Sequence, residues 1–398
     1  MHVFLANIKL FYGNSIKRFS FTSNVHKTEF HYLCNMTVKL NILPLSSWMP
    51  LSALPFVIAG PCSAETEEQV LSTAHELAKI PQVRVFRSGI WKPRTRPSSF
   101  EGVGTIGLKW LQEVKQETGL MTTIEVANPN HVEQALKYGV DILWIGARTV
   151  VNPFSVQEIS SVLEGVDIPV MVKNPLNPDI KVWIGALERI NQSGINKIIA
   201  VHRGFSFFTR SPYRNAPMWE IPIELKTIFP ELPVIADPSH ICGDKRLLLS
   251  TAQKALDLEM NGLMIETHVR PEEALTDKQQ QITPSALREM ISHIILRKEY
   301  GNVEFENKLE ELRTEIDKLD EELIDILARR MSIVEEIGKY KKQNSITILQ
   351  LKRWSQIIRN RVDNGVSLGL SREFLLKLLE ALHEESIQRQ TDVMNRER

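Results

Sequence analysis

The sequence carries no excess charge of either sign, because 48 Lys and Arg residues balance 48 Asp and Glu residues. Binding to nucleic acid or to an acidic membrane surface needs an excess of positive charge, so we expect neither as a partner. Cysteine is also scarce: Cys34, Cys62 and Cys242 are the only three in 398 residues. Such a number argues against a disulfide framework and is typical of a reducing compartment, which predicts a cytoplasmic protein.

A hydrophobic run suited to crossing a membrane is missing as well. Residues 40–64 contain no charged side chain, but prolines interrupt them four times. Each proline removes a backbone donor and breaks a helix, so we expect no membrane span. Residues 1–50 form a poorly patterned N-terminal extension, in which residues 1–35 hold four Lys and Arg residues against one Glu. A transit peptide and an upstream start codon chosen in place of Met36 both remain open for this segment.

Proline is absent from the C-terminal part, since none of the 20 prolines follows Pro284. Before Pro284 the chain shows eight short apolar or β-branched runs, each of strand length. These runs cover residues 56–59, 83–87, 121–126, 141–145, 168–173, 197–202, 233–237 and 262–266. Helical patterns at 67–79, 107–117 and 245–257 fill several of the gaps. The alternation predicts an α/β fold of the (β/α)8 TIM-barrel class over residues 51–297, with a doubly wound open sheet as the alternative.

The part after Pro284 predicts a second, all-α domain. A charged linker at 298–308 precedes a helix whose apolar residues step by three and four, the spacing of a coiled-coil seam. The seam residues are Leu309, Leu312, Ile316, Leu319, Leu323 and Ile326. We expect a second helix at 351–362, ended by residues 363–365, and a third at 371–391. These three helices make a domain at 309–392, followed by a tail at 393–398.

Reactive side chains follow nearly every predicted strand, and in a barrel the strand ends meet at one mouth. Cys62, His240 and Glu266, with Asp277 in the next loop, offer a thiolate, an imidazole and carboxylates. This donor set suits a divalent transition metal such as Mn, Fe, Co or Zn better than Mg. Taken alone, Cys62 is better explained as a small buried hydrophobe. The four donors together favour the metal.

A second group at the same mouth is cationic. Its members are Arg87, Lys92, Arg94, Arg148, Lys173 and Arg203. Guanidinium groups bind phosphate and carboxylate oxygens in pairs, so this many cations in a neutral protein predict ligands with more than one phosphate. The alternative is that two or three of them form solvated salt bridges, which contribute little.

Four motifs in this part resemble those of 3-deoxy-D-arabino-heptulosonate 7-phosphate (DAHP) synthases. They are Ala-Gly-Pro-Cys-Ser-Ala-Glu at residues 59–65, Lys-Pro-Arg-Thr at 92–95, Gly-Ala-Arg-Thr at 146–149 and Asp-Pro-Ser-His at 237–240. The resemblance covers residues 55–295 and implies a metal-dependent barrel that condenses phosphoenolpyruvate with erythrose 4-phosphate. A sister family, which makes an eight-carbon sugar acid, shares the fold and the chemistry. Its loop usually resembles Lys-Ala-Asn-Arg, so residues 92–95 argue against it.

The resemblance also implies roles for the residues at these positions. Cys62, His240, Glu266 and Asp277 would bind the metal; Arg87, Lys92, Arg148, Lys173 and Arg203 would hold phosphoenolpyruvate; Arg94 and Thr95 would hold the aldose phosphate. We predict Lys92, Lys173 and His202 as catalytic residues of the barrel. An alternative mechanism is that of a Schiff-base aldolase, with Lys173 as the nucleophile.

Arg330 lies where the helical seam of the second domain continues, and a charge on an apolar seam is costly unless an anion pairs with it. A register-setting polar residue in a helix pair is the alternative. At about 1.5 Å per residue, Lys341 lies about 16 Å after Arg330 and Arg313 about 25 Å before it. Lys341 can therefore share a pocket with Arg330, whereas Arg313 must serve a second pocket, which predicts a homodimer through this domain.

The same residues resemble the all-helical chorismate mutases, over residues 305–392. That family's active-site positions are occupied here by Arg313, Arg330, Lys341, Arg353, Ser386 and Gln390. The resemblance implies that arginines grip the carboxylates of chorismate, that Lys341 and Gln390 stabilise its ether oxygen as prephenate forms, and that no cofactor takes part. Gln350 and Trp354 stand where the family often has acidic residues. The chain is thus predicted to be a bifunctional enzyme. The alternative is a dimerising helical domain that senses chorismate or prephenate, inhibits the barrel and has weak mutase activity.

Overall fold

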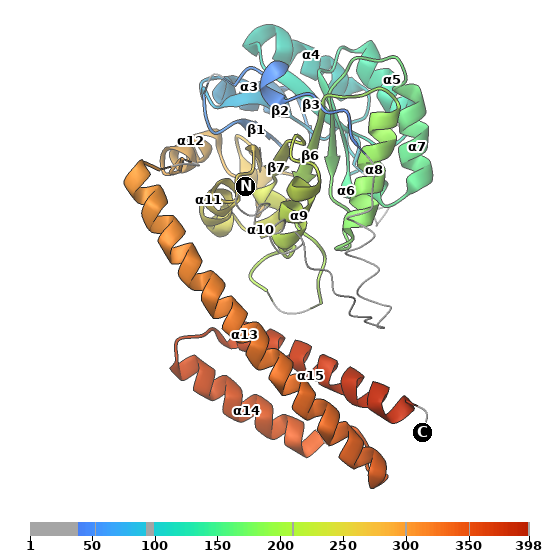
Figure 1. Cartoon of the computed structure of the whole chain (residues 1–398). Helices are drawn as coiled ribbons and strands as arrows, with labels where there is room; N and C mark the ends of the chain where they lie inside the picture. Colours follow the sequence, from blue (N-terminus) through green and yellow to red (C-terminus); the bar gives the residue numbers. More distant parts are fainter. Residues whose placement is uncertain are drawn as a thin grey trace. The chain divides into compact units, whose positions relative to one another are not determined.

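Eight parallel strands close into a barrel in the order of the sequence, with helices around them (Figure 1). The strands are β1 Val57–Gly60, β2 Val83–Arg87, β3 Met121–Val126, β4 Ile142–Ile145, β5 Val170–Lys173, β6 Ile198–His202, β7 Val234–Ala236 and β8 Gly262–Glu266. All eight lie within two residues of the predicted runs, so the (β/α)8 fold is confirmed and the open sheet is excluded. The prediction succeeds because parallel strands are covered on both faces and are therefore continuously apolar.

The computed structural model describes residues 39–51, 53–92, 99–208, 211–298, 301–349 and 351–396, without the side chains of residues 351–357. Cys34 and most of the predicted N-terminal extension lie outside the described residues, as do Arg94, Thr95 and Gln350. The chain divides into two compact units after Arg297. In the part that is described, no helix combines the length and the apolar character needed to cross a membrane.

Helices in the first unit connect the strands and cover the outside of the barrel. They are α3 Glu67–Ala78, α4 Ile106–Thr118, α5 Pro129–Lys137, α6 Ala147–Val150, α7 Pro153–Val162, α8 Ile180–Gln192, α9 Glu220–Ile228, α10 Pro238–Cys242, α11 Leu248–Asp257 and α12 Pro284–Ser292. Polar side chains begin several of them: Thr66, Asn128 and Asp179 accept hydrogen bonds from the first-turn backbone of α3, α5 and α8. These caps replace the partners that the first N–H groups of a helix lack.

The inside of the barrel is filled by its own strand residues and by a short segment that precedes β1. Ile58, Trp144 and Met171 belong to one buried cluster inside the barrel. The 3-10 helix η1 (Leu45–Ser47) adds Leu45 to this cluster, and Met49 follows it. The interior is therefore packed rather than open, which leaves the strand ends as the place for polar groups.

Met49 is 2% exposed, and we expect Met49→Ala to lower the free energy of unfolding of the barrel by about 2–4 kcal/mol, the usual cost of truncating a buried large residue. Urea denaturation followed by far-UV circular dichroism measures the change. Ser46→Ala, at an exposed position of η1, is the control and should stay within about 0.5 kcal/mol of the parent. An equal stability of Met49→Ala and the parent would show that this segment does not support the barrel.

The second unit consists of three helices: α13 Val303–Gln343, α14 Leu351–Ser367 and α15 Arg372–Asn395. Helix α15 packs against both α13 and α14. Its start is set by Ser371, whose side chain accepts a hydrogen bond from the Phe374 backbone N–H. The predicted all-α, three-helix domain is therefore present, in the predicted order.

Three boundaries in this unit differ from the prediction. Helix α13 begins at Val303, inside the predicted linker at 298–308, because Asn302 caps it through the Phe305 N–H. Helix α14 continues through residues 363–365, and Gly365 packs so closely on α15 that an added Cβ would lie 2.6 Å from Leu375 Cδ1. Packing between helices thus outweighs the weak helix propensity of Asp, Asn and Gly. Helix α15 runs to Asn395 and includes part of the predicted tail.

Candidate active sites

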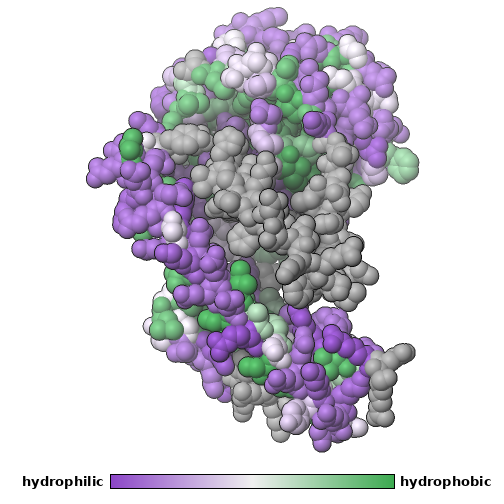
Figure 2. All heavy atoms as spheres, viewed as in Figure 1, coloured by the Kyte–Doolittle hydropathy of each residue, from purple (hydrophilic) through white to green (hydrophobic). Residues whose placement is uncertain are grey.

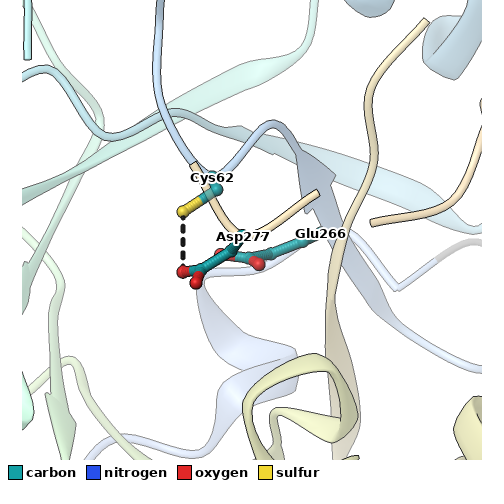
Figure 3. A group of neighbouring side chains, drawn as sticks. All are labelled: Cys62, Glu266 and Asp277. Atoms are coloured by element: carbon teal, nitrogen blue, oxygen red, sulfur yellow. Dashed lines mark hydrogen bonds between the residues drawn. The ribbon is translucent and has the colours of Figure 1, made fainter. Parts of the chain in front are cut away.

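A cluster of possible metal ligands lies at the mouth of the barrel, where β1 and β8 end (Figure 3). Cys62 follows β1, Glu266 is the last residue of β8, and Asp277 lies in the loop after it. One ligand atom from each of the three lies within 4.8 Å of the others, and Cys62 Sγ donates a hydrogen bond to Asp277 Oδ2 at 3.3 Å. The structure therefore brings together three of the four predicted ligands. One thiol with two carboxylates is a donor set that fits a divalent transition metal.

His240, the fourth predicted ligand, borders this cluster. It lies on α10, and its Nε2 is 3.7 Å from Glu266 Oε1. Its other ring nitrogen, Nδ1, lies 2.8 Å from Asp237 Oδ2, and Asp237 Oδ1 accepts the His240 backbone N–H. A carboxylate on one ring nitrogen orients the other nitrogen of a metal-binding histidine. The sequence motif contained Asp237, but this orienting role was not predicted.

Burial and neighbouring charges set the protonation of the cluster's thiol and of its Glu266 carboxylate. Burial, followed by the charge of Glu266, raises the pKa of Cys62 to about 12. Burial alone would also raise the pKa of Glu266, but His240 and Arg87 outweigh it, so that this pKa falls below its usual range. Lys92 Nζ donates to Cys62 Sγ at 3.1 Å and to its carbonyl oxygen at 3.0 Å. A thiol that holds its proton beside ionised carboxylates is a group that a metal ion converts to thiolate.

Two of the predicted anion-binding cations are buried at the ends of β2 and β5. Arg87 Nη2 donates to Glu266 Oε1 at 3.0 Å, and Lys173 Nζ donates to Asp237 Oδ2 at 2.9 Å. The Trp144 ring lies beneath both, 5.1 Å from Arg87 Cζ and 5.7 Å from Lys173 Nζ. Arg87 Nε and Nη1 are buried without a hydrogen-bond partner among the described residues. Buried donors of this kind call for a ligand, because leaving them unpaired is costly.

The remaining described cations lie around the same mouth. Arg203, after β6, donates to Asn215 Oδ1 at 2.9 Å. Burial, together with the charges of nearby Arg214 and Arg148, lowers its pKa to about 10. Arg148 is exposed on α6. His202 ends β6 and contacts the rings of Phe205 and Trp219, with centroid distances of 5.7 and 5.1 Å. Burial lowers the pKa of His202 to about 3, so its imidazole is neutral at physiological pH.

In the helical unit, three of the predicted residues converge. Arg330 Nη1, on α13, donates to Ser386 Oγ on α15 at 2.8 Å. Gln390 lies one turn further along α15; it is 8% exposed, and its Oε1 is buried without a partner among the described residues. Burial lowers the pKa of Arg330. These polar groups lie together where α13 packs against α15.

The contacts that the structure shows for Lys341 and Arg313 are with other groups. Lys341 Nζ donates to the Ile348 carbonyl oxygen near the end of α13. Arg313 is exposed near the start of α13, and its Nη1 lies 3.8 Å from Glu310 Oε2. The side chain of Arg353 lies outside the described residues. The expectation that Arg313 serves a second pocket stays a prediction.

Comparisons with known proteins match both units. The family model described as "DAHP synthetase I family" matches residues 53–299, and that described as "Chorismate mutase type II" matches residues 312–391. The phospho-2-dehydro-3-deoxyheptonate aldolase of Thermotoga maritima is 32% identical over 238 residues, which cover 60% of this chain and 68% of that protein. A crystal structure of the Thermotoga maritima enzyme aligns with a TM-score of 0.54 at 31% identity, over 60% of this chain and 67% of that one. The 2-dehydro-3-deoxyphosphooctonate aldolase of Wolinella succinogenes is 27% identical, over 60% of this chain and 97% of that protein.

Proposed function

Since the chain belongs to the DAHP synthetase I family and also contains a type II chorismate mutase domain, we propose that it is a bifunctional, cytoplasmic shikimate-pathway enzyme. Its barrel, residues 51–297, condenses phosphoenolpyruvate with D-erythrose 4-phosphate to DAHP and phosphate. Its helical domain, residues 309–392, rearranges chorismate to prephenate. Residues 298–308 connect the two as a linker, whose second half is helical from Val303.

One observation carries the barrel proposal. The metal-ligand cluster and the buried cations share a mouth, and the 3.0 Å contact between Arg87 Nη2 and Glu266 Oε1 joins the two groups directly. Anionic substrates held by Arg87 are therefore within reach of an ion held beside Glu266. Such an arrangement suits a condensation between two phosphorylated molecules, whose mutual repulsion fixed cations must offset.

The cluster would hold Mn, Fe, Co or Zn through Cys62, His240, Glu266 and Asp277. When bound, the ion supplies Lewis acidity to the aldehyde of erythrose 4-phosphate. Asp237 orients the His240 ring, and Lys92 hydrogen bonds to the Cys62 sulfur. In the reaction a carbon–carbon bond forms between the methylene carbon of phosphoenolpyruvate and the aldehyde carbon. Water then adds at the enol carbon, and phosphate leaves.

The cationic residues hold phosphoenolpyruvate during these steps. Arg87 offers two buried donors that have no partner among the described residues, Lys173 ends β5, and Arg203 directly follows the neighbouring strand β6. Trp144 supports Arg87 and Lys173 from below, since an aromatic face stabilises a desolvated cation. Lys92, Lys173 and His202 remain the proposed catalytic residues, and Arg148 a substrate ligand; Arg94 and Thr95 would bind the aldose phosphate.

The Schiff-base alternative finds less support. A lysine nucleophile needs a free amine that can reach the substrate, whereas Lys173 Nζ is engaged by the buried Asp237 Oδ2 at 2.9 Å. Sequence identity supports the DAHP reaction over the eight-carbon reaction. The chain is 32% identical to the phospho-2-dehydro-3-deoxyheptonate aldolase of Thermotoga maritima and 27% identical to the 2-dehydro-3-deoxyphosphooctonate aldolase of Wolinella succinogenes.

A phosphate-release assay of the purified chain tests the barrel function. Release should require both phosphoenolpyruvate and erythrose 4-phosphate, should stop with EDTA and should return with Mn²⁺, Co²⁺ or Zn²⁺. Activity that survives EDTA, together with borohydride trapping of substrate on Lys173, would establish the Schiff-base mechanism instead. A preference for arabinose 5-phosphate would assign the chain to the eight-carbon reaction.

For the helical domain, Arg330, Arg353 and Ser386 would bind the carboxylates of chorismate, with Lys341 and Gln390 at the ether oxygen, where negative charge develops. Arg313 would come from the second chain of a homodimer. Apolar side chains exposed along α13 support this assembly: Leu312, Ile316, Leu319 and Leu323 are 44–62% exposed. Figure 2 shows hydrophobic side chains among hydrophilic ones on the visible face of this unit. A row of exposed apolar side chains along one helix is typical of an interaction surface.

A further inference from the structure

Two consecutive glutamines, Gln280 and Gln281, lie in the loop between β8 and α12 and are 1% and 0% exposed. Neither was predicted as a site residue. Their side chains bond to different partners: Glu266 itself, the backbone at or next to Cys62 and Asp277, and Arg214, which in turn contacts Asp277. A buried primary amide offers two donors and an acceptor, all of which require partners.

Gln281 ties Cys62 to the loop that carries Asp277. Its Oε1 accepts a hydrogen bond from the Cys62 backbone N–H at 3.0 Å. Its Nε2 donates to the carbonyl oxygen of Thr276, the residue before Asp277, at 2.8 Å. One side chain thereby bridges segments more than 200 residues apart in sequence and sets the spacing of the thiol from the carboxylate.

Gln280 acts on the two carboxylates. Its Nε2 donates to Glu266 Oε2 at 2.6 Å, and its Oε1 accepts from Arg214 Nη1 at 2.7 Å. Arg214 Nη1 also donates to Asp277 Oδ1 at 2.9 Å. The chain of contacts from Glu266 through Gln280 and Arg214 to Asp277 leaves Glu266 Oε1 and Asp277 Oδ2 facing the cluster.

The same two loops are joined at a second point, further from the cluster. The hydroxyl oxygens of Ser63 and Thr276 are 2.6 Å apart, and Glu65 Oε1 accepts the Leu275 backbone N–H at 2.8 Å. The loops would therefore remain connected if one glutamine were replaced, which makes a folded variant attainable.

We propose that Gln280 and Gln281 are positioning residues that preassemble Cys62, Glu266 and Asp277 for a divalent metal ion. This inference rests on the metal dependence proposed above. All of these hydrogen bonds join groups of the chain itself, and together they fix the positions of the three donors relative to one another. Residues that hydrogen bond to metal ligands raise metal affinity about 10- to 100-fold.

The test is a Co²⁺ titration of the full-length, EDTA-stripped protein, followed by the absorbance of the cobalt–thiolate bond. Gln281→Met and Gln280→Met keep the length of the side chain and remove its hydrogen bonds. We expect the Kd for Co²⁺ to rise about 10- to 100-fold in each variant. Gln279→Met, at an exposed position of the same loop, is the matched control and should keep the parental Kd.

Thermal unfolding of the metal-free proteins separates positioning from folding. Each glutamine variant should retain a cooperative transition while its Kd rises. A variant with a lower unfolding temperature but a parental Kd would show a purely structural role and overturn the proposal, as would a parental Kd in both variants. If one variant fails to fold, the other decides. A parent protein that binds no Co²⁺ would overturn the proposed metal dependence. This outcome differs from a failure of the glutamine proposal, in which the parent protein binds Co²⁺ and the variants bind it equally well.

Discussion

Replacing Cys62 with alanine is expected to lower the rate of the condensation at least about 10³-fold, while chorismate is still converted to prephenate. The change removes the only sulfur donor of the cluster described here and leaves Glu266 and Asp277. Loss of a Lewis acid removes several kcal/mol of transition-state stabilisation, and about 4 kcal/mol corresponds to 10³ in rate. Phosphate release, measured beside the metal content of the purified protein, gives the result.

Cys242→Ala is the control for this experiment. Cys242 is buried, and its thiol donates a weak hydrogen bond to Thr251 Oγ1 rather than to a proposed ligand. That variant should keep both its metal and its activity. A Cys62→Ala protein that retains a full equivalent of metal and a tenth of its activity would contradict the role assigned to the thiol.

The second large effect is expected for Arg330→Ala, which should lower kcat/KM for chorismate about 10²- to 10³-fold. Arg330 is partly buried, bonds to Ser386 and has a pKa lowered by burial, so an anionic ligand there meets a desolvated guanidinium. Truncating one partner of such a pair costs about 3–4 kcal/mol. The formation of prephenate from chorismate measures the loss, and the condensation should continue at the parental rate.

Arg329→Ala provides the matched control, because Arg329 is the neighbouring residue and is exposed. It should retain parental mutase activity. The pair of variants also separates catalysis from sensing. If the parent shows no measurable mutase activity, and Arg330→Ala abolishes inhibition of the barrel by chorismate or prephenate, then the helical domain is a sensor rather than a mutase.

Much of the fold was predictable, because buried parallel strands leave continuous apolar runs and strand-end residues share one mouth. Cys62, Glu266 and Asp277 could be grouped in advance on this basis. Helix α14 was predicted too short, because the close packing of Gly365 against Leu375 joins two separate helices, α14 and α15. The supporting roles of Asp237, Trp144 and Gln281 were not visible for the same reason. Each depends on a contact through space, whereas their residue types alone are consistent with ordinary core positions.

The ion pair between Arg87 and Glu266 connects the metal-ligand cluster to the buried cations, because the Glu266 carboxylate belongs to the cluster and pairs with Arg87. A metal ion bound as proposed would share the charge of Glu266 with Arg87, so it would weaken this ion pair and leave the guanidinium freer to bind an anion. Thermodynamic linkage then requires the reverse effect, so that the anion tightens the ion by the same factor. The order in which substrate and metal arrive therefore changes neither the final complex nor its total free energy, and the two affinities vary together.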